Sequence, residues 1–313
     1  SSMQYRILGN TGLEVSVLSY GASPLGSVFR GVAEPEGIRT VHTALDLGIN
    51  FIDVSPYYGL TKAETLLGKA LQPIKRDRYY LATQVGRYGS EMTDFDFSAQ
   101  RVTRSVDESL ARLGVDHVDI IQCHDIEFGD LRQVIEETLP ALRKIVAAGK
   151  ARFVGITGLP LAVFSRIIDH AEVDTLLSYC HYSLNDPSLA GLLPYLREKG
   201  VGIISASPLS MGLLSNREPP AWHPAPAEIR QACAKAAELA RSRGADIAKL
   251  AVQFAVAEPR IATTLVGTAS PENIAKNVRW IDEPMDMDLL AAVRKTLAPI
   301  HDRTWPSGRP ENN

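Results

Sequence analysis

The chain has 313 residues, of which 45% are hydrophobic and 22% charged, and its formal net charge is −3. This composition is typical of a globular protein and allows one large domain or two ordinary ones. The sequence contains no basic block that would bind nucleic acid or a membrane surface, and no apolar run long enough to span a bilayer. We therefore expect neither nucleic acid nor a membrane as a partner.

The N-terminus and the cysteines favour a cytoplasmic protein. The segment Ser1-Ser2-Met3-Gln4 lacks a signal-peptide pattern, and Met3 is expected to be the natural start. Three cysteines lie far apart in the chain: Cys123, Cys180 and Cys233. An odd number without Cys-x-x-Cys spacing argues against a disulfide framework or structural zinc. His124 and His181 each follow a cysteine, but zinc ligands usually have a tighter local spacing, so we expect no metal site.

Expected strands and helices alternate regularly along the chain, after a turn at residues 9–12 that indicates a short hairpin. The expected strands are short and apolar, and cover residues 17–21, 50–53, 79–85, 118–123, 152–156, 175–180, 201–205 and 262–266. The expected helices cover residues 38–47, 63–71, 98–113, 131–148, 161–170, 189–199, 228–243, 247–257 and 271–281. The helix after Ser98 has a capping residue at its start and Gly114 at its end. A last helix at residues 287–300 lies outside the alternation.

The strand pattern favours a single closed α/β domain. The strands show no clean polar alternation, which suits a parallel sheet buried on both faces. Strand–helix units repeated over this length predict a (β/α)₈ TIM barrel covering residues 1–313, with an N-terminal hairpin and an extra C-terminal helix. A doubly wound sheet is the alternative. It usually carries Gly-x-Gly-x-x-Gly after the first strand, whereas Gly21-Ala22-Ser23-Pro24-Leu25-Gly26 stands there.

The most informative segment is Asn50-Phe51-Ile52-Asp53-Val54-Ser55-Pro56-Tyr57-Tyr58-Gly59, where an apolar strand opens into a loop. A carboxylate and a phenol at this point could share a pocket and exchange a proton. In a TIM barrel, functional side chains follow the carboxyl ends of the strands. That rule selects these candidates at one mouth: Asp53, Tyr58, Gln84, His124, Asp125, Thr157, Ser178, His181 and Ser207.

Ordered motifs along nearly the whole chain resemble the aldo-keto reductase superfamily, and within it the plant L-galactose dehydrogenase group and bacterial sugar dehydrogenases. The early motifs are Gly21-Ala22-Ser23-Pro24-Leu25-Gly26, the Asp53 segment and Cys123-His124-Asp125-Ile126-Glu127-Phe128. The central motifs are Gly155-Ile156-Thr157-Gly158-Leu159-Pro160, Leu177-Ser178-Tyr179-Cys180-His181-Tyr182 and Ser205-Ala206-Ser207-Pro208-Leu209. The late motifs are Trp222-His223-Pro224 and Thr304-Trp305-Pro306-Ser307-Gly308.

The resemblance implies catalysis by Asp, Tyr, Lys and His, of which Asp53, Tyr58 and His124 are present. Gln84 stands in the place of the lysine, in Ala82-Thr83-Gln84. We expect Gln84 to hydrogen-bond Tyr58 without supplying charge, and the pKa of Asp53 to rise because its ion-pair partner is missing. The substitution is compatible with an engineered trap, a natural enzyme with different demands, or a protein that no longer catalyses.

The resemblance also implies a dinucleotide across the barrel mouth. Its expected contacts are Gly21, Thr157, Ser178, Ser207, Leu209, Gly267, Thr268, Ser270, Asn273 and Asn277. Relatives that prefer NADP place Lys and Arg where Gly267 and Asn273 stand here. A 2′-phosphate needs positive charge or bidentate donors, so we expect NAD, with Lys276 as the one nearby cation that could oppose this.

Aromatic and polar residues are expected on the pocket rim, as suits a sugar: Tyr57, Asp125, Tyr179, His181 and Trp305. The leading hypothesis is an NAD-dependent aldose 1-dehydrogenase that oxidises C1 of an L-galactose or L-fucose type sugar to the lactone. The alternatives are an NADPH-dependent carbonyl reductase and a catalytically silent nucleotide-binding relative. The sequence does not indicate an oligomeric state.

Overall fold

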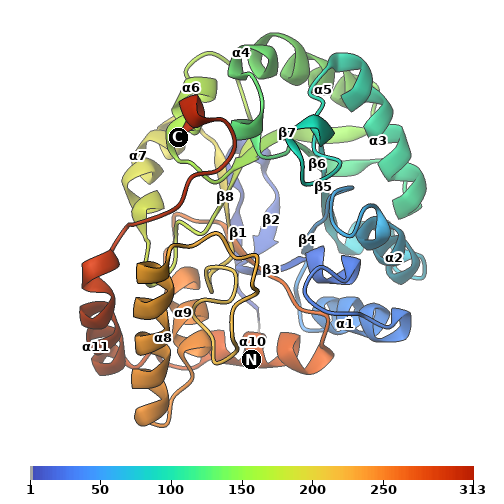
Figure 1. Ribbon diagram of the computed structural model, residues 1–313. Coiled ribbons are helices and arrows are strands. Elements are labelled where there is room, and N and C mark those ends of the chain that lie inside the picture. Colours follow the sequence, from blue (N-terminus) through green and yellow to red (C-terminus); the bar gives the residue numbers. More distant parts are fainter. Residues whose placement is uncertain (1–2) are drawn as a thin grey trace.

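The computed structural model describes residues 3–313 and contains a closed barrel of eight parallel strands in the order β10-β3-β4-β5-β6-β7-β8-β9 (Figure 1). The predicted (β/α)₈ fold is therefore confirmed. The barrel strands are β3 (Leu18–Gly21), β4 (Phe51–Asp53), β5 (Tyr80–Val85), β6 (Val118–Cys123), β7 (Ala151–Gly158), β8 (Thr175–Tyr179), β9 (Gly202–Ala206) and β10 (Thr263–Val266).

Helices surround the barrel and bury the outer faces of its strands (Figure 1). Those in the first half are α1 (Glu34–Asp46), α2 (Lys62–Leu71), α3 (Ala99–Leu113), α4 (Leu131–Gln133), α5 (Leu139–Ala147) and α6 (Ala162–Ile168). Those in the second half are α7 (Leu193–Glu198), α8 (Ala227–Ser242), α9 (Ile247–Val256), α10 (Pro271–Asp282) and α11 (Met287–Leu297). The extra C-terminal helix is α11, which packs on α8 in a second apolar cluster.

Two helices expected as single elements are interrupted, each near a proline. The expected helix 131–148 contains a π-helical stretch, Val134–Thr138, between α4 and α5. Pro140 follows it and has no N–H to donate, which breaks the regular ladder at that turn. The expected helix 189–199 begins as a 3₁₀ turn, Ser188–Leu192, and becomes α-helical only at α7, which has Pro194 near its start.

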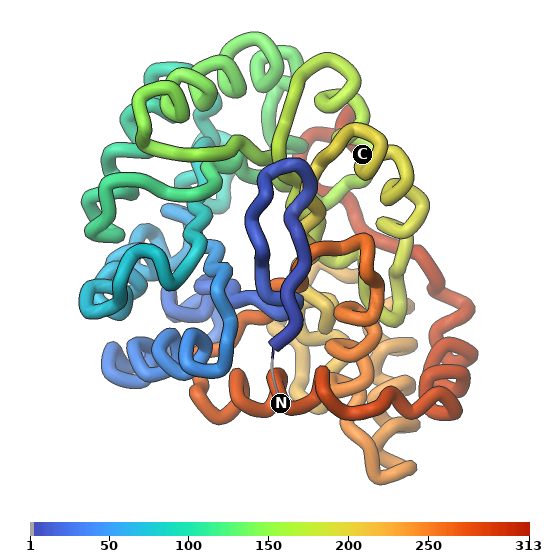
Figure 2. The backbone as a smooth tube through the Cα atoms, turned by 180° about the vertical axis from the view of Figure 1, so that it is seen from behind, coloured from blue at the N-terminus to red at the C-terminus, as the bar shows by residue number. Residues whose placement is uncertain are grey.

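An N-terminal hairpin closes the amino-terminal end of the barrel, as the sequence predicts. Its strands are β1 (Tyr5–Ile7) and β2 (Glu14–Ser16), and it crosses the barrel end seen in Figure 2. Leu8, Leu13 and Val15 are buried in the same cluster as inward-facing Phe51 and Ile120. This floor leaves only the opposite end, at the carboxyl ends of the strands, open for a ligand.

Close backbone packing fixes the hairpin in place. Gly9 has a φ of +50°, and a Cβ there would lie 2.3 Å from the backbone nitrogen of Gly202 on β9. The neighbouring Asn10 donates its backbone N–H to the carbonyl of Gly200 at 3.0 Å. Only glycine allows this approach without displacing the barrel strand.

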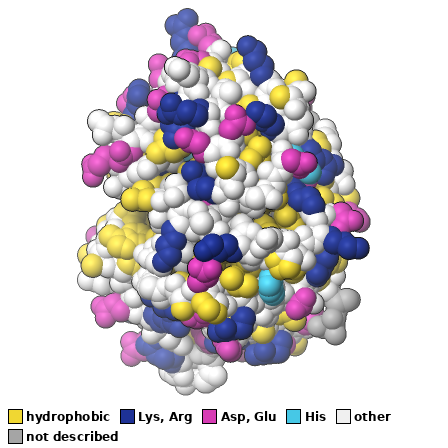
Figure 3. All heavy atoms as spheres, turned by 90° about the vertical axis from the view of Figure 1, so that its right-hand side faces the viewer, with side chains coloured by type: hydrophobic (Ala, Val, Ile, Leu, Met, Phe, Trp, Pro, Cys, Tyr) yellow, Lys and Arg dark blue, Asp and Glu magenta, His cyan; other side chains and the backbone are white. Residues whose placement is uncertain are grey.

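The outer surface carries acidic and basic side chains side by side on the face shown in Figure 3. Within residues 3–313, no helix has both the length and the apolar character needed to cross a membrane.

The floor predicts a large stability difference between two neighbouring hairpin residues. Leu8 is fully buried, whereas Ile7 is 52% exposed. We expect Leu8→Ala to lower the free energy of unfolding by about 2–5 kcal/mol, because it leaves a cavity inside the barrel. The matched change Ile7→Ala should alter it by about 0.5 kcal/mol or less. Urea unfolding of both variants measures this, and equal effects would mean that the hairpin is not part of the core.

Candidate active site

Three polar side chains from consecutive strands line the barrel interior at the open end. Asp53 is the last residue of β4, and Gln84 pairs in register with Gln122 across β5 and β6. Ala82 and Ile120, two residues earlier on these strands, belong to the inner apolar cluster. Side chains alternate along a strand, so Gln84 and Gln122 also point inward, one layer above the floor.

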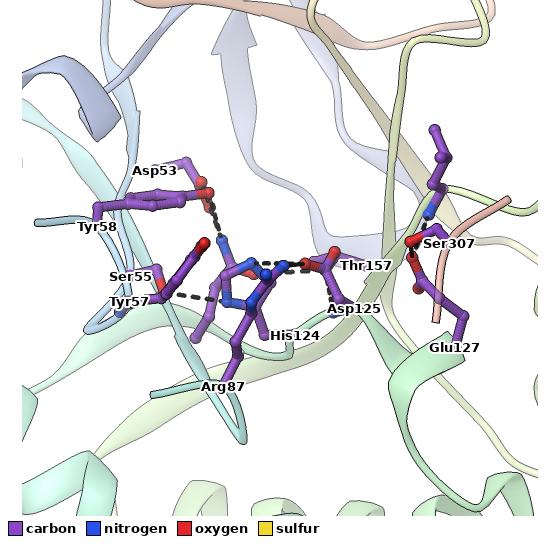
Figure 4. Close-up of polar contacts among 12 residues, drawn as sticks. Asp53, Ser55, Tyr57, Tyr58, Arg87, His124, Asp125, Glu127, Thr157 and Ser307 are labelled. Atoms are coloured by element: carbon purple, nitrogen blue, oxygen red, sulfur yellow. Dashed lines mark hydrogen bonds and ion pairs between the residues drawn. The ribbon is translucent and has the colours of Figure 1, made fainter. Parts of the chain in front are cut away.

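Gln84 bridges Asp53 and Tyr58. Its Nε2 lies 3.2 Å from Oδ2 of Asp53 and 3.4 Å from the Tyr58 hydroxyl. Figure 4 shows the Tyr58 hydroxyl directed toward the Asp53 carboxyl. Gln122 donates to the other carboxyl oxygen of Asp53 at 2.7 Å. Two neutral amides therefore surround a buried carboxyl, and the expected hydrogen bond from Gln84 to Tyr58 is present.

Burial raises the pKa of both Asp53 and Tyr58. Burial raises the pKa of Asp53 from 3.8 to about 7, although hydrogen bonds from Gln122 and Gln84 oppose the rise. Burial, and then the charges of Asp53 and Asp125, raise the pKa of Tyr58 well above its ordinary value of 10. The rise expected for Asp53 from the sequence is thus present, and Tyr58 is a neutral phenol near neutral pH.

His124 lies beside Tyr58, with ring centroids 5.9 Å apart in an edge-to-face arrangement (Figure 4). Its Nδ1 is 3.0 Å from the Ser55 hydroxyl, and its Nε2 is 3.4 Å from Oδ2 of Asp125. Ser55 already accepts the backbone N–H of Tyr57 at 3.1 Å, which leaves its hydroxyl proton for Nδ1. This pattern favours the tautomer with the proton on Nε2.

Burial lowers the pKa of His124 to about 4, with the nearby Arg87 adding to the effect and Asp125 opposing it. The imidazole is therefore neutral at physiological pH. A neutral Nε2–H next to a phenol gives two hydrogen-bond donors that can hold one carbonyl or hydroxyl oxygen of a substrate.

An ion pair that sequence reasoning missed completes the mouth. Nη1 of Arg87, in the loop after β5, lies 2.6 Å from Oδ2 of Asp125. The guanidinium also lies over the Tyr57 ring, 4.0 Å from its centroid. Arg87 follows Gln84 by three residues, so its position just beyond a strand end was the available signal. Ser55 and Gln122 were also missed, because a serine in a loop and a glutamine in a strand have no distinctive pattern.

Three further predicted residues are engaged with the protein itself or lie away from the catalytic group. The Thr157 hydroxyl accepts the backbone N–H of Asp125 at 2.9 Å and lies 3.4 Å from Oε1 of Gln84, so it positions the mouth. Nδ1 of His181 contacts the Asp186 carboxylate at 2.9 Å. Trp305 packs edge-to-face on His223, 5.3 Å between centroids, within the second apolar cluster.

The structure does not bring Ser178 to the site. Leu177 belongs to the inner cluster and Leu176 to the outer one, so alternation along β8 directs Ser178 outward. A strand position shifted by one residue faces the opposite side of the sheet, so the expected cofactor contact of Ser178 would have to be made from outside the barrel interior. The inward-facing neighbours are Leu177 and Tyr179.

The remaining predicted cofactor residues gather around the mouth at β3, β9, β10 and α10: Gly21, Ser207, Leu209, Gly267, Thr268, Ser270, Asn273 and Asn277. Ser270 caps α10 by accepting the Asn273 backbone N–H at 3.2 Å. The Asn273 amide lies 3.4 Å from the Thr268 hydroxyl. These neutral donors at a helix N-terminus fit a phosphate diester and ribose hydroxyls.

No cation reinforces that end of the predicted cofactor site among Gly267, Thr268, Ser270 and Asn273. A side chain at Gly267 would be crowded, since a Cβ there lies 3.3 Å from the Pro24 ring. The nearby Lys276 has its ammonium 5.4 Å from the centroid of the Trp280 ring. The donors at residues 267, 268, 270 and 273 are therefore all neutral.

The C-terminal segment is attached to the mouth through Glu127. The Ser307 hydroxyl donates to Oε2 of this buried carboxyl at 2.7 Å (Figure 4). Arg309 and Asn312 bind the Glu127 carbonyl at 2.9 and 2.8 Å. Burial, with the charge of Asp125, raises the pKa of Glu127 to about 8. The chain end thus covers the loop that carries His124 and Asp125.

The chain resembles known proteins along its length. The model of the aldo/keto reductase family matches residues 17–298. L-galactose dehydrogenase of Arabidopsis thaliana is 50% identical over 321 aligned positions that cover 100% of both chains. D-arabinose 1-dehydrogenase of Saccharomyces cerevisiae is 33% identical, with 78% of this chain and 76% of that protein aligned.

A solved structure agrees with these matches. An aldo-keto reductase from Bacillus halodurans, in its holo form, has a TM-score of 0.79 at 26% identity, and the superposition covers 97% of this chain and 98% of that one. Since the family model spans most of the sequence and the barrel geometry agrees, the chain belongs to the aldo/keto reductase family.

Proposed function

We propose that this chain is an NAD-dependent aldose 1-dehydrogenase that oxidises the C1 hydroxyl of an L-galactose or L-fucose type pyranose to the lactone. The observation that carries the proposal is the pairing of Tyr58 and His124 at the barrel mouth, 5.9 Å between ring centroids. It occurs in a chain that is 50% identical throughout to a plant L-galactose dehydrogenase.

Different residues of the chain have different roles in the reaction at C1. Tyr58 accepts the proton of the C1 hydroxyl in its phenolate form, which the raised pKa makes the minor form near neutral pH. Nε2–H of His124 holds the same oxygen as it becomes a carbonyl. Gln84 fixes the phenol at 3.4 Å and joins it to Asp53. Bound nicotinamide supplies the acceptor for the hydride that leaves C1. Closely packed walls and the floor keep these groups in one geometry.

Residues around the start of α10 would hold the adenosine end of the cofactor: Thr268, Ser270, Asn273 and Asn277. Gly21 ends β3 and Ser207 follows β9, the two strands on either side of β10, where the rest of an extended dinucleotide would pass. The absence of a cation at residues 267 and 273 supports NAD as the preferred form.

The proposal predicts that NADH absorbance appears when the chain is mixed with NAD and L-galactose, and that Tyr58→Phe lowers kcat by roughly 10²–10⁴-fold. The phenyl ring keeps the packing but cannot take a proton. Tyr5→Phe is the matched control, because its hydroxyl is exposed on the N-terminal hairpin and donates to the Gly48 carbonyl at 2.7 Å. Cofactor binding measured by fluorescence should be unchanged in both variants. NADH formation that persists in Tyr58→Phe would exclude this role.

Gln84→Lys is expected to raise kcat for aldose oxidation at least about tenfold near pH 7. An ammonium between Asp53 and Tyr58 should lower the phenol pKa by about 1–3 units. Gln84→Met serves as the control, since it removes the hydrogen bonds to Asp53, Tyr58 and Thr157 and adds no charge. A Lys variant that binds cofactor but stays inactive with every aldose would favour the catalytically silent alternative.

The same variant changes the pH dependence of stability. With its pKa at about 7 rather than 3.8, native Asp53 holds its proton more tightly than the unfolded chain does. Its contribution to the free energy of unfolding therefore falls as pH rises from about 4 to 7. Lysine at position 84 should lower this pKa and weaken or reverse the fall. Urea unfolding of both proteins at pH 5 and pH 7.5 measures the difference.

Asn273→Arg should increase affinity for NADP by roughly 10–100-fold, because a charge-assisted hydrogen bond to the 2′-phosphate becomes available. Affinity for NAD should change little. Fluorescence titration with both cofactors measures this, and Lys276→Ala is the comparison. Lys276→Ala weakening NADP binding as strongly as Asn273→Arg improves it would mean that Lys276 already binds the 2′-phosphate. The assignment of NAD would then lose its basis.

A further inference from the structure

Arg87 is held rigidly at the mouth, although the chemistry at C1 does not use it. Its guanidinium carbon lies 4.0, 4.9 and 5.0 Å from the ring centroids of Tyr57, Phe95 and Phe128. Phe95 and Phe128 stack on each other at 4.3 Å, and the Arg87 side chain is only 14% exposed. Three aromatic rings therefore fix the plane of the guanidinium and remove most of its water.

The ion pair still has unused hydrogen-bonding capacity. Arg87 donates a hydrogen bond from Nη1 to Asp125 and one from Nε to the Gly89 carbonyl at 3.2 Å. Within residues 3–313, its Nη2 and the Oδ1 of Asp125 have no hydrogen-bond partner, and neither atom is sealed from solvent. One open donor and one open acceptor thus lie next to each other at the mouth.

This donor and acceptor lie beside the reacting position. Nε2 of His124, which would hold the oxygen on C1, is 3.4 Å from Oδ2 of Asp125. Hydroxyl oxygens on adjacent pyranose carbons are separated by about one hydrogen-bond length, roughly 2.8 Å. A sugar whose O1 contacts His124 therefore places its next hydroxyls within reach of Asp125 and Arg87 in turn.

We infer that the Arg87–Asp125 pair is the element that selects the sugar, by binding the hydroxyls on C2 and C3 next to the reacting carbon. Asp125 accepts from one hydroxyl and Arg87 donates to the other, and the Tyr57 ring that Arg87 covers holds the pair in place. This inference rests on the proposed function, because it places C1 at Tyr58 and His124.

The charge of the pair specifies the class of substrate. The positive guanidinium is neutralised by the carboxylate 2.6 Å away. The pair therefore offers hydrogen bonds to a neutral polyol and no net attraction to an anion. Sugar phosphates and uronates should be poorer substrates than neutral aldoses, whereas an unpaired arginine would favour them.

The test compares L-galactose with its 2-deoxy, 3-deoxy and 6-deoxy derivatives, the last being L-fucose. The proteins are the parent chain, Arg87→Lys and the neutral double variant Arg87→Met/Asp125→Asn. In the parent, loss of the C2 or C3 hydroxyl should lower kcat/KM by roughly 10–100-fold, because the charged group facing that position loses a hydrogen bond to the substrate. For the double variant, kcat/KM for L-galactose and kcat/KM for its 2-deoxy or 3-deoxy derivative should agree within about threefold. L-fucose should react with equal relative efficiency in all proteins.

Arg101→Met is the matched control, because Arg101 also lies over an aromatic ring and pairs with a carboxylate, but on α3. The guanidinium carbon of Arg101 is 3.9 Å from the centroid of the Tyr88 ring, and its Nη1 is 2.8 Å from Oε1 of Glu108. This variant should keep the parental preference for hydroxyls. Thermal unfolding and NAD titration identify any variant that has merely lost its fold. If the double variant is unfolded, Arg87→Lys takes its place in the comparison, because it keeps the positive charge beside Asp125.

The outcomes separate this inference from the proposed function. If aldoses react but the ratio of kcat/KM for L-galactose to that for each deoxy sugar is the same in the parent and the double variant, only the role of Arg87–Asp125 is overturned. If neither the parent nor Gln84→Lys oxidises any aldose, the proposed function fails. The same ratios are then measured as dissociation constants by calorimetry on the NAD-loaded chain, where equal ratios, or no sugar binding at all, overturn the inference.

Discussion

Burial of the Asp53 carboxyl without a positive partner is the constraint on which this active site depends. A carboxylate inside a barrel is strongly disfavoured unless charge or hydrogen bonds compensate for lost water. Here Gln84 and Gln122 donate to both carboxyl oxygens, at 3.2 and 2.7 Å. Amides are weaker compensation than an ammonium, so the pKa of Asp53 rises to about 7. The proton affinity of Tyr58, its neighbour through Gln84, rises as well.

The positive charge of the site lies further out, on Arg87. It is paired with Asp125 rather than with Asp53, and it is fixed against aromatic rings at the rim. Charge at this place acts on what enters the mouth more than on the buried phenol. In the proposed function the site therefore separates two tasks that one lysine cannot perform: neutral amides organise the proposed proton acceptor, and an ion pair is the proposed contact to the substrate.

The barrel ends hold the Asp53 group and the Arg87–Asp125 pair in fixed positions relative to each other. The hairpin fills one end of the barrel, where Gly9 contacts the backbone of β9. At the other end, Ser307 and Asn312 attach the chain terminus to Glu127, in the loop that follows His124 and Asp125. The loop residue Asp125 has a φ of +48°, a conformation that needs support from its surroundings. Thr157 supplies part of that support through the Asp125 backbone N–H.

The amino-acid sequence alone determined the barrel, the family and the identity of the residue at the lysine position. These follow from local patterns: apolar strands separated by amphipathic helices, and short motifs in a fixed order. Tertiary structure decided what those patterns do not encode. Arg87 meets Tyr57 and Asp125 only because the barrel closes and brings three separate loops to one rim. The direction of the Ser178 side chain was not readable from the sequence, because a shift of one residue along a strand reverses the face, and only pairing with neighbouring strands fixes that phase.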